Sequence, residues 1–156
     1  MGAGLDFRSG LKHLRAPMET EPFLSSTVLR AVRESFGTPA FVYREDLLRA
    51  AARRVRGFPN AFGLTPRFAA KACPNAAVLR IFASEGLHFD ASSGWEARRI
   101  LRAGIPGDHI SLSSQELPED FAELVEAGVR INACSLRQLE RFGVRFPGRE
   151  VGIRIN

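Results

Sequence analysis

Lysine is almost absent from this basic chain. Lys12 and Lys71 are the only two lysines among 22 basic residues, and arginine supplies the rest. The arginines alternate with glutamate and aspartate and form no continuous basic block. One tryptophan and one tyrosine offer few rings on which bases could stack. These absences argue against a nucleic-acid-binding protein, although the net charge is +5.

The sequence also lacks the marks of metal-binding, secreted and membrane proteins. Cys73 and Cys134 are its two cysteines, and they form no C-x-x-C pair, so we expect neither a zinc site nor a disulfide framework. No stretch approaches the ~20 apolar residues of a membrane span, and the N-terminus has no apolar segment typical of a signal peptide. We therefore expect a cytoplasmic protein with reduced thiols, no bound metal and no membrane contact.

What the sequence does contain is a regular alternation of strand-like and helical segments. Each unit covers a short apolar run, a helical pattern and a glycine, and the segments after Pro66 follow one another with short connections. Alternation of this kind predicts βαβ units and a parallel sheet. The strands are short and mostly apolar, as expected when both faces of a sheet are covered. The expected strands lie at 67–71, 87–92, 108–114, 129–134 and 149–156.

Two architectures satisfy this alternation, a doubly wound open sheet and a (β/α)8 barrel. No G-x-G-x-x-G or G-x-x-x-x-G-K-[ST] sequence is present, which weakens the nucleotide-binding open sheet. A complete barrel takes roughly 250 residues, whereas this chain has 156. We therefore predict an α/β fold that is a partial (β/α)8 barrel, its first five or so strands, after an N-terminal helix–strand segment.

The predicted organisation has two parts. Residues 1–36 form an arm, irregular to about residue 22, and a helix over 25–37 that Ser25 or Ser26 can cap. Residues 37–156 form the barrel half, with a short strand at 38–43 and a helix at 44–57 before the repeat begins. The chain is thus expected to be a truncated barrel without a C-terminal β-domain.

Polar residues gather where the predicted strands end, which is where parallel α/β folds place their chemistry. Lys71 follows the first strand of the repeat, and Asp90 follows the second. A lysine at the end of an apolar strand is poorly solvated, which favours its neutral form, and a neutral amine can attack an aldehyde. Asp90 and Glu96 are candidates to orient it. The alternative is a lysine that extends to solvent or pairs with Asp90 for stability.

Three stretches together carry a resemblance: "FGTPAFVYREDLLRA", "FAAKACPNAAVLRIFASEGLHFDASSGWEARRILRAGIP" and "GVRINACSLRQLERFG". From about Phe36 to Asn156 they resemble the N-terminal half of the pyridoxal-phosphate decarboxylases with the alanine-racemase-like fold. The likeness is strongest to diaminopimelate decarboxylases, and ornithine decarboxylases are more distant. Cys73 and Phe68 depart from the family's usual asparagine and tyrosine, and "SLSSQELPEDF" replaces the usual sequence after the third strand.

The resemblance implies roles for five residues. Lys71 matches the lysine that binds pyridoxal 5'-phosphate covalently, and Ala70 precedes it in the same cofactor-binding motif. Asp90 corresponds approximately to the family's aspartate, and Glu96 matches the glutamate of its S-x-G-x-E motif. Arg154 matches an arginine that lies beside the cofactor ring.

The resemblance also implies an activity, the decarboxylation of meso-diaminopimelate to L-lysine and CO2, in a protein that is a homodimer when complete. The later barrel strands and the C-terminal β-domain supply further cofactor and substrate groups in the family, so the isolated chain is expected to be inactive. Two alternatives remain open. One is a non-catalytic pyridoxal-phosphate-binding protein of the same fold, and the other is a decarboxylase of ornithine, arginine or carboxynorspermidine.

Overall fold

A computed structural model describes residues 23–155 of the chain, which divides into two compact units, Met1–Val42 and Tyr43–Asn156. In the first unit, helix α1 (Ser26–Phe36) begins where Ser25 Oγ accepts a hydrogen bond from the Val28 amide at 3.3 Å. It ends at Gly37, whose φ of 75° suits glycine. The predicted helix is thus confirmed, whereas the arm at 1–22 lies outside the described residues.

The strand predicted at 38–43 is wrong. These residues are irregular, and Phe41 is 93% exposed. A strand is stable only when its backbone groups pair with a neighbour, and no other described segment pairs with this one. The apolar residues of the segment therefore predicted a strand that lacks a partner.

The second unit contains a parallel sheet in which each strand lies beside the one before it. The order is β1-β2-β3-β4-β5, and all four pairings are parallel. In a doubly wound sheet the strand order reverses at a switch point, whereas the sequential strand order seen here is that of a barrel. Among the described residues β1 and β5 do not pair with each other, so the barrel is partial, as predicted. The strands are β1 (Arg67–Ala69), β2 (His88–Ala91), β3 (Ile110–Leu112), β4 (Arg130–Ala133) and β5 (Gly152–Ile153).

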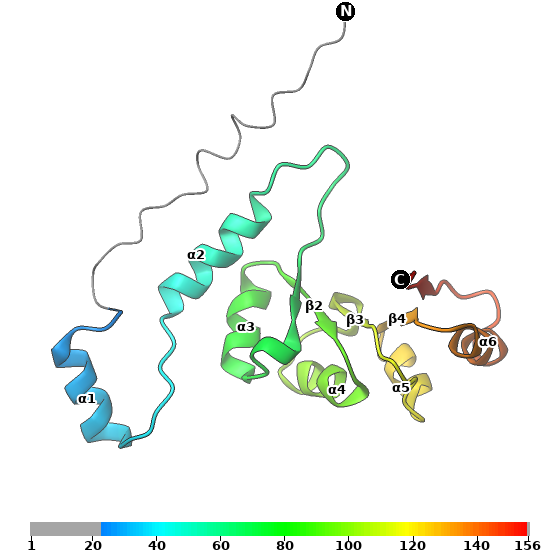
Figure 1. The fold of residues 1–156 in the computed structure, drawn as a ribbon. Helices are drawn as coiled ribbons and strands as arrows, with labels where there is room; N and C mark the ends of the chain where they lie inside the picture. The colour runs from blue at the N-terminus through cyan, green and yellow to red at the C-terminus, as the bar shows by residue number, and fades with distance from the viewer. Residues whose placement is uncertain (1–22, 156) are drawn as a thin grey trace, which may run out of the picture. The chain divides into compact units, whose positions relative to one another are not determined.

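Helices connect the strands of this unit, and Figure 1 shows these helices lying along the sheet in chain order. A helix, α2, precedes β1, and short 3-10 turns follow β1 and precede β3. The helices are α2 (Glu45–Arg56), α3 (Ala76–Ser84), α4 (Gly94–Arg102), α5 (Phe121–Glu126) and α6 (Leu136–Arg145), and the turns are η2 (Ala70–Ala72) and η3 (Gly107–His109).

The two faces of the sheet differ in polarity. Phe89, Ile110 and Leu112 are at most 1% exposed and belong to the apolar core that includes Leu79 and Ile100 of the helices. Partners in parallel register share a face, as do residues two apart. The opposite face, called the polar face below, therefore carries polar side chains, so the expectation of strands apolar on both faces is wrong. The residues of the polar face are Arg67, His88, Asp90, Ser111, Arg130 and Asn132.

Candidate functional site

Lys71 lies in η2, directly after β1. The chain turns there, so that Ala70 is buried at 1% exposure while Lys71 is exposed. The expectation of a poorly solvated lysine is therefore wrong, because the 3-10 turn directs the neighbouring alanine into the core instead. No described carboxylate lies within ion-pair distance of the Lys71 amine. The amine is thus accessible to solvent and has no carboxylate partner among the described residues.

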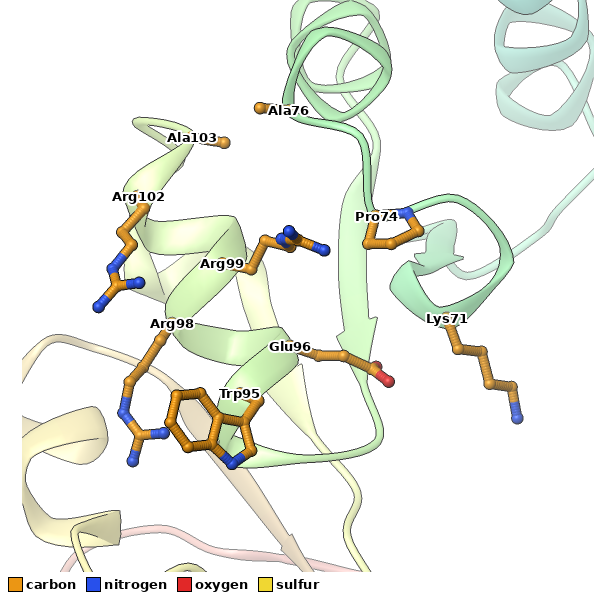
Figure 2. Close-up of a pocket in the computed structure, with 9 residues that line it drawn as sticks. All are labelled: Lys71, Pro74, Ala76, Trp95, Glu96, Arg98, Arg99, Arg102 and Ala103. Atoms are coloured by element: carbon orange, nitrogen blue, oxygen red, sulfur yellow. The ribbon is translucent and has the colours of Figure 1, made fainter. Parts of the chain in front are cut away.

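A cavity of about 640 Å³ opens beside Lys71. One of its walls is a face of α4, where the spacing 95, 98, 99 and 102 places four side chains in one row. Figure 2 shows Arg99 extending from α4 toward Pro74, Glu96 extending toward the turn that carries Lys71, and Arg98 beside Trp95. The Arg98 guanidinium carbon lies 5.2 Å from the centre of the Trp95 ring and its nitrogen pairs with Asp120. The lining residues are Lys71, Pro74, Ala76, Trp95, Glu96, Arg98, Arg99, Arg102 and Ala103.

The row of arginines on α4 was not among the sequence-based site residues. Its signal was present in the stretch "WEARRILR", because an aromatic residue and three arginines recur at spacings of three and four. The cavity is consequently basic, since Glu96 is the one acidic residue in its described lining.

Glu96 has a structural task as well as a place in the cavity. Its Oε2 accepts a hydrogen bond from the Ser92 amide at 2.8 Å, and Ser93 Oγ accepts one from the Glu96 amide at 3.3 Å. Together these bonds cap the start of α4 in the manner of an S-x-x-E capping box. Glu96 and Lys71 line the same cavity, but no ion pair joins them in the described part of the chain.

Asp90 lies at the end of a hydrogen-bonded chain that crosses the polar face. Ser113 Oγ donates to Asp90 Oδ1 at 3.1 Å, and Asn132 Nδ2 donates to Ser113 Oγ at 2.9 Å and to Ser111 Oγ at 2.7 Å. A polar chain of this kind, when satisfied, rigidifies the strands that carry it. Asp90 thus partners a serine and not Lys71, which removes the predicted Lys71–Asp90 pair.

Arg154 follows β5, and its amide donates to the Ala133 carbonyl oxygen at 2.9 Å. It therefore continues the β4–β5 edge at the same end of the sheet as Lys71, Asp90 and Asn132, and its side chain is exposed. The strand-end rim predicted from the sequence is present.

Sequence reasoning missed Gln138. This residue of α6 is 6% exposed, and its Oε1 accepts a hydrogen bond from the Cys134 amide at 2.8 Å. Its Nε2 donates to the carbonyl oxygens of Ser114 at 3.1 Å and Gln115 at 2.7 Å. The side chain thus ties the segment after β3 to the segment after β4. The S-x-x-Q spacing from Ser135 was the available signal, since it repeats the S-x-x-E cap of α4.

Two further classes of site can be judged for the described residues. No group of three or more histidine, cysteine or acidic side chains there could hold a metal ion. Among the same residues, no helix combines the length and the apolar character that crossing a membrane requires.

Comparison with known proteins decides the family. The family model described as pyridoxal-dependent decarboxylase, pyridoxal binding domain, matches residues 48–156. The chain belongs to this family. The matched range contains every sequence-predicted site residue, from Ala70 and Lys71 to Arg154.

Among curated decarboxylases, the diaminopimelate decarboxylase of Streptomyces coelicolor is 37% identical over 133 residues, which are 82% of this chain and 29% of that protein. The Pseudomonas fluorescens diaminopimelate decarboxylase is 34% identical over 140 residues, 86% of this chain and 32% of that protein. The crystal structure of a Vibrio vulnificus lysine/ornithine decarboxylase complexed with putrescine gives a TM-score of 0.74 at 25% identity, over 85% of this chain and 37% of that one. This decarboxylase-family chain therefore spans about a third of the length of these relatives.

The site residues fit the chemistry of pyridoxal 5'-phosphate. The cofactor's aldehyde requires an accessible primary amine, and Lys71 supplies one that is exposed and has no ion-pair partner among the described residues. Its charged groups require polar partners, and the same end of the sheet carries Asp90, Ser113 and Asn132. The described residues therefore offer an accessible amine and polar side chains at one end of the sheet, which are groups that such a cofactor requires.

Proposed function

We propose that this chain is part of a pyridoxal-phosphate-dependent decarboxylase that converts meso-diaminopimelate to L-lysine and CO2. The observation that carries the proposal is the exposed Lys71 amine directly after β1 of a pyridoxal-binding domain. The substrate assignment is supported by the curated relatives named diaminopimelate decarboxylase, at 37% and 34% identity. Residues 37–156 then form the first part of the cofactor-binding barrel, and further strands and a β-domain complete the enzyme.

In this proposal Lys71 binds the cofactor through its Nζ atom, and the bound cofactor supplies a ring that takes up the electron pair left when CO2 departs. Ala70, held in the core, fixes the backbone from which Lys71 projects. Glu96 places a carboxylate in the cavity of Lys71. Asp90 and Arg154 contribute a negative and a positive charge at the same end of the sheet and orient the cofactor ring.

One observation favours a second substrate. The Vibrio vulnificus lysine/ornithine decarboxylase has the same arrangement of elements at a TM-score of 0.74. Ornithine is therefore the second candidate, and it differs from diaminopimelate by a shorter chain and by the absence of a second carboxylate. A complete protein carrying this segment should release CO2 from meso-diaminopimelate faster than from ornithine, and the reverse preference would overturn the substrate assignment.

The role of Lys71 can be tested on the chain itself. The protein is mixed with pyridoxal 5'-phosphate, reduced with borohydride and digested, and the labelled peptide is identified by mass spectrometry. We expect the label on Lys71, and we expect Lys71→Ala to lose it. Lys12→Ala is the matched control, since it removes the other lysine of the chain, and it should leave the label in place. Label on Lys12 alone, or equal label on both lysines, would contradict the assignment.

The isolated chain should not release CO2 above background from meso-diaminopimelate, ornithine or arginine, because the proposed site needs strands that these residues do not supply. Turnover that Lys71→Ala abolishes would show instead that the chain assembles a working site by self-association.

We also propose that the complete enzyme is a cytoplasmic homodimer. The proposal is supported by the resemblance to the family and by the two cysteines, neither of which is in a disulfide. Light scattering of the complete protein would measure the dimer, and a monomer at working concentration would contradict it.

A further inference from the structure

The start of the strands, opposite the end that carries Lys71, gathers positive charge on the polar face. Arg67 of β1 is in register with His88 of β2, and Arg130 of β4 is in register with Ser111 of β3. None of the six ion pairs found among the described residues includes Arg67, Arg130 or Arg149. The charges at this end of the sheet are therefore not balanced by a contact within the described chain.

Two buried polar atoms at this place have no hydrogen-bond partner. They are Nη1 of Arg67 and Nδ1 of His88, and they are the two such side-chain atoms found in the described residues. Buried polar groups are nearly always satisfied, so an orphaned atom calls for a partner from outside the described structure. Both orphans belong to residues that are in register on one face of the sheet.

The electrostatics of both side chains agree with this reading. Burial, and then the neighbouring charge of Arg130, lowers the pKa of Arg67, while Asp90 opposes the shift. Burial also lowers the pKa of His88, followed by His109, Arg67 and Arg130, with Asp108 acting in the opposite direction. His88 stacks on His109 with ring centres 4.2 Å apart and planes 17° apart, which fixes the imidazole in place. The surroundings of both groups thus carry an excess of positive charge.

A cavity of about 850 Å³ opens beside Arg67 and Arg130. Arg67, Arg130 and Arg149 line it together with the hydroxyl of Ser111 and the amide of Asn132. Glu150 is the one acidic residue in its described lining, and it pairs with none of the three arginines. A space lined by three guanidinium groups and the Ser111 hydroxyl is suited to an anion.

We propose that the strand-start end of the polar face binds an oxyanion, a carboxylate or a phosphate group, held by Arg67 and Arg130. Guanidinium groups bind the planar edge of such groups through paired charge-assisted hydrogen bonds. The anion accepts charge-assisted hydrogen bonds from the guanidinium groups of Arg67 and Arg130, which line the cavity, and it lies near His88, the register partner of Arg67. A carboxylate would come from an acidic side chain packed over this face, and a phosphate would come from a free anion. The arginines would bind either group in the same way.

The test uses the whole chain without cofactor. Inorganic phosphate and acetate are titrated separately at constant ionic strength, and the imidazole resonances of His88 and His109 are followed by NMR. We expect a saturable shift of the His88 resonance with at least one of the two anions. Arg67→Gln should weaken the apparent affinity about tenfold, because it removes charge-assisted hydrogen bonds, and Arg130→Gln serves as the second variant should Arg67→Gln fold poorly.

Arg102→Gln is the matched control. It removes the same charge from an exposed arginine in the cavity beside Lys71, so it should leave the His88 titration unchanged. Saturation by acetate alone assigns a carboxylate, and saturation by phosphate assigns a phosphate group. A shift that grows linearly with both anions, or that Arg102→Gln weakens as much as Arg67→Gln does, would overturn the proposal.

Discussion

Gln138 provides the sharpest test of how the strand ends are held. Its side-chain amide makes three hydrogen bonds to backbone groups of two loops. In one of these bonds, Oε1 of Gln138 accepts from the Cys134 amide at 2.8 Å. Gln138→Ala removes all three. The Cys134 amide then loses its acceptor in a partly buried place.

The size of the effect follows from the cost of an unsatisfied group. A buried donor without a partner costs about 1–3 kcal/mol, and the partial burial of this amide argues for about 1–2 kcal/mol. That free energy corresponds to a factor of about 5–30 in the opening equilibrium. Amide hydrogen exchange measured residue by residue by NMR should therefore show the protection of Cys134 falling by this factor, with a smaller loss in the segment of Ser114 and Gln115.

Two comparisons make the result decisive. Arg137→Ala changes the exposed neighbour on the same helix and should leave the Cys134 exchange unchanged. The amides of β3 report opening of the whole unit, so a local effect leaves them protected. An unchanged Cys134 amide in Gln138→Ala, or an equal loss across β3, would refute the reasoning.

Three other predictions concern stability. Two arginines of α2, chiefly Arg53, lower the pKa of Glu85 from its ordinary value of 4.5 to about 2. The stabilisation from the ionised Glu85 carboxylate is therefore complete above pH 4.5 and is lost as the pH falls toward 2. Glu85→Gln should consequently flatten the decline of Tm in that interval. A decline of Tm equal to that of the unchanged protein would contradict this prediction. A Cβ at Gly107 would overlap the backbone oxygen of Ala127, so Gly107→Ala should cost about 1–3 kcal/mol in urea unfolding. Gly143→Ala in α6 meets no atom within 4 Å and should stabilise by about 0.4–1 kcal/mol, and equal effects of the two substitutions would contradict the steric reasoning.

The sequence predicted the parallel sheet because its signals are local. Glycine and proline mark the ends of the elements, and the apolar runs between them are too short for helices. The strand at 38–43 failed for the complementary reason. Its composition suits a strand, but strand formation depends on a distant partner that no local pattern reveals.

The site was predicted in its location but not in its contacts. Chain order places Lys71 and Asp90 after their strands, and this holds because parallel strands end at one rim. Whether Lys71 is buried depends on a 3-10 turn of a single residue triplet, and the side chain that Asp90 contacts depends on the register of β2 and β3. The burial of Lys71 and the contacts of Asp90 are set by packing between strands, and local sequence patterns do not reveal that packing.

The sequential order of the strands has a consequence for how the protein is made. Paired residues of neighbouring strands, such as Arg67 and His88 or Asn132 and Gly152, are about 20 positions apart along the chain. Each new strand therefore pairs with the strand synthesised just before it, and forming these contacts closes only a short loop of the chain. During translation at about 5–20 residues per second, each βα unit can dock on its predecessor while the next is still within the ribosome. The newest strand then exposes its outer edge for a few seconds until the next strand pairs with it, whereas the outer edge of β1 stays unpaired among the described residues.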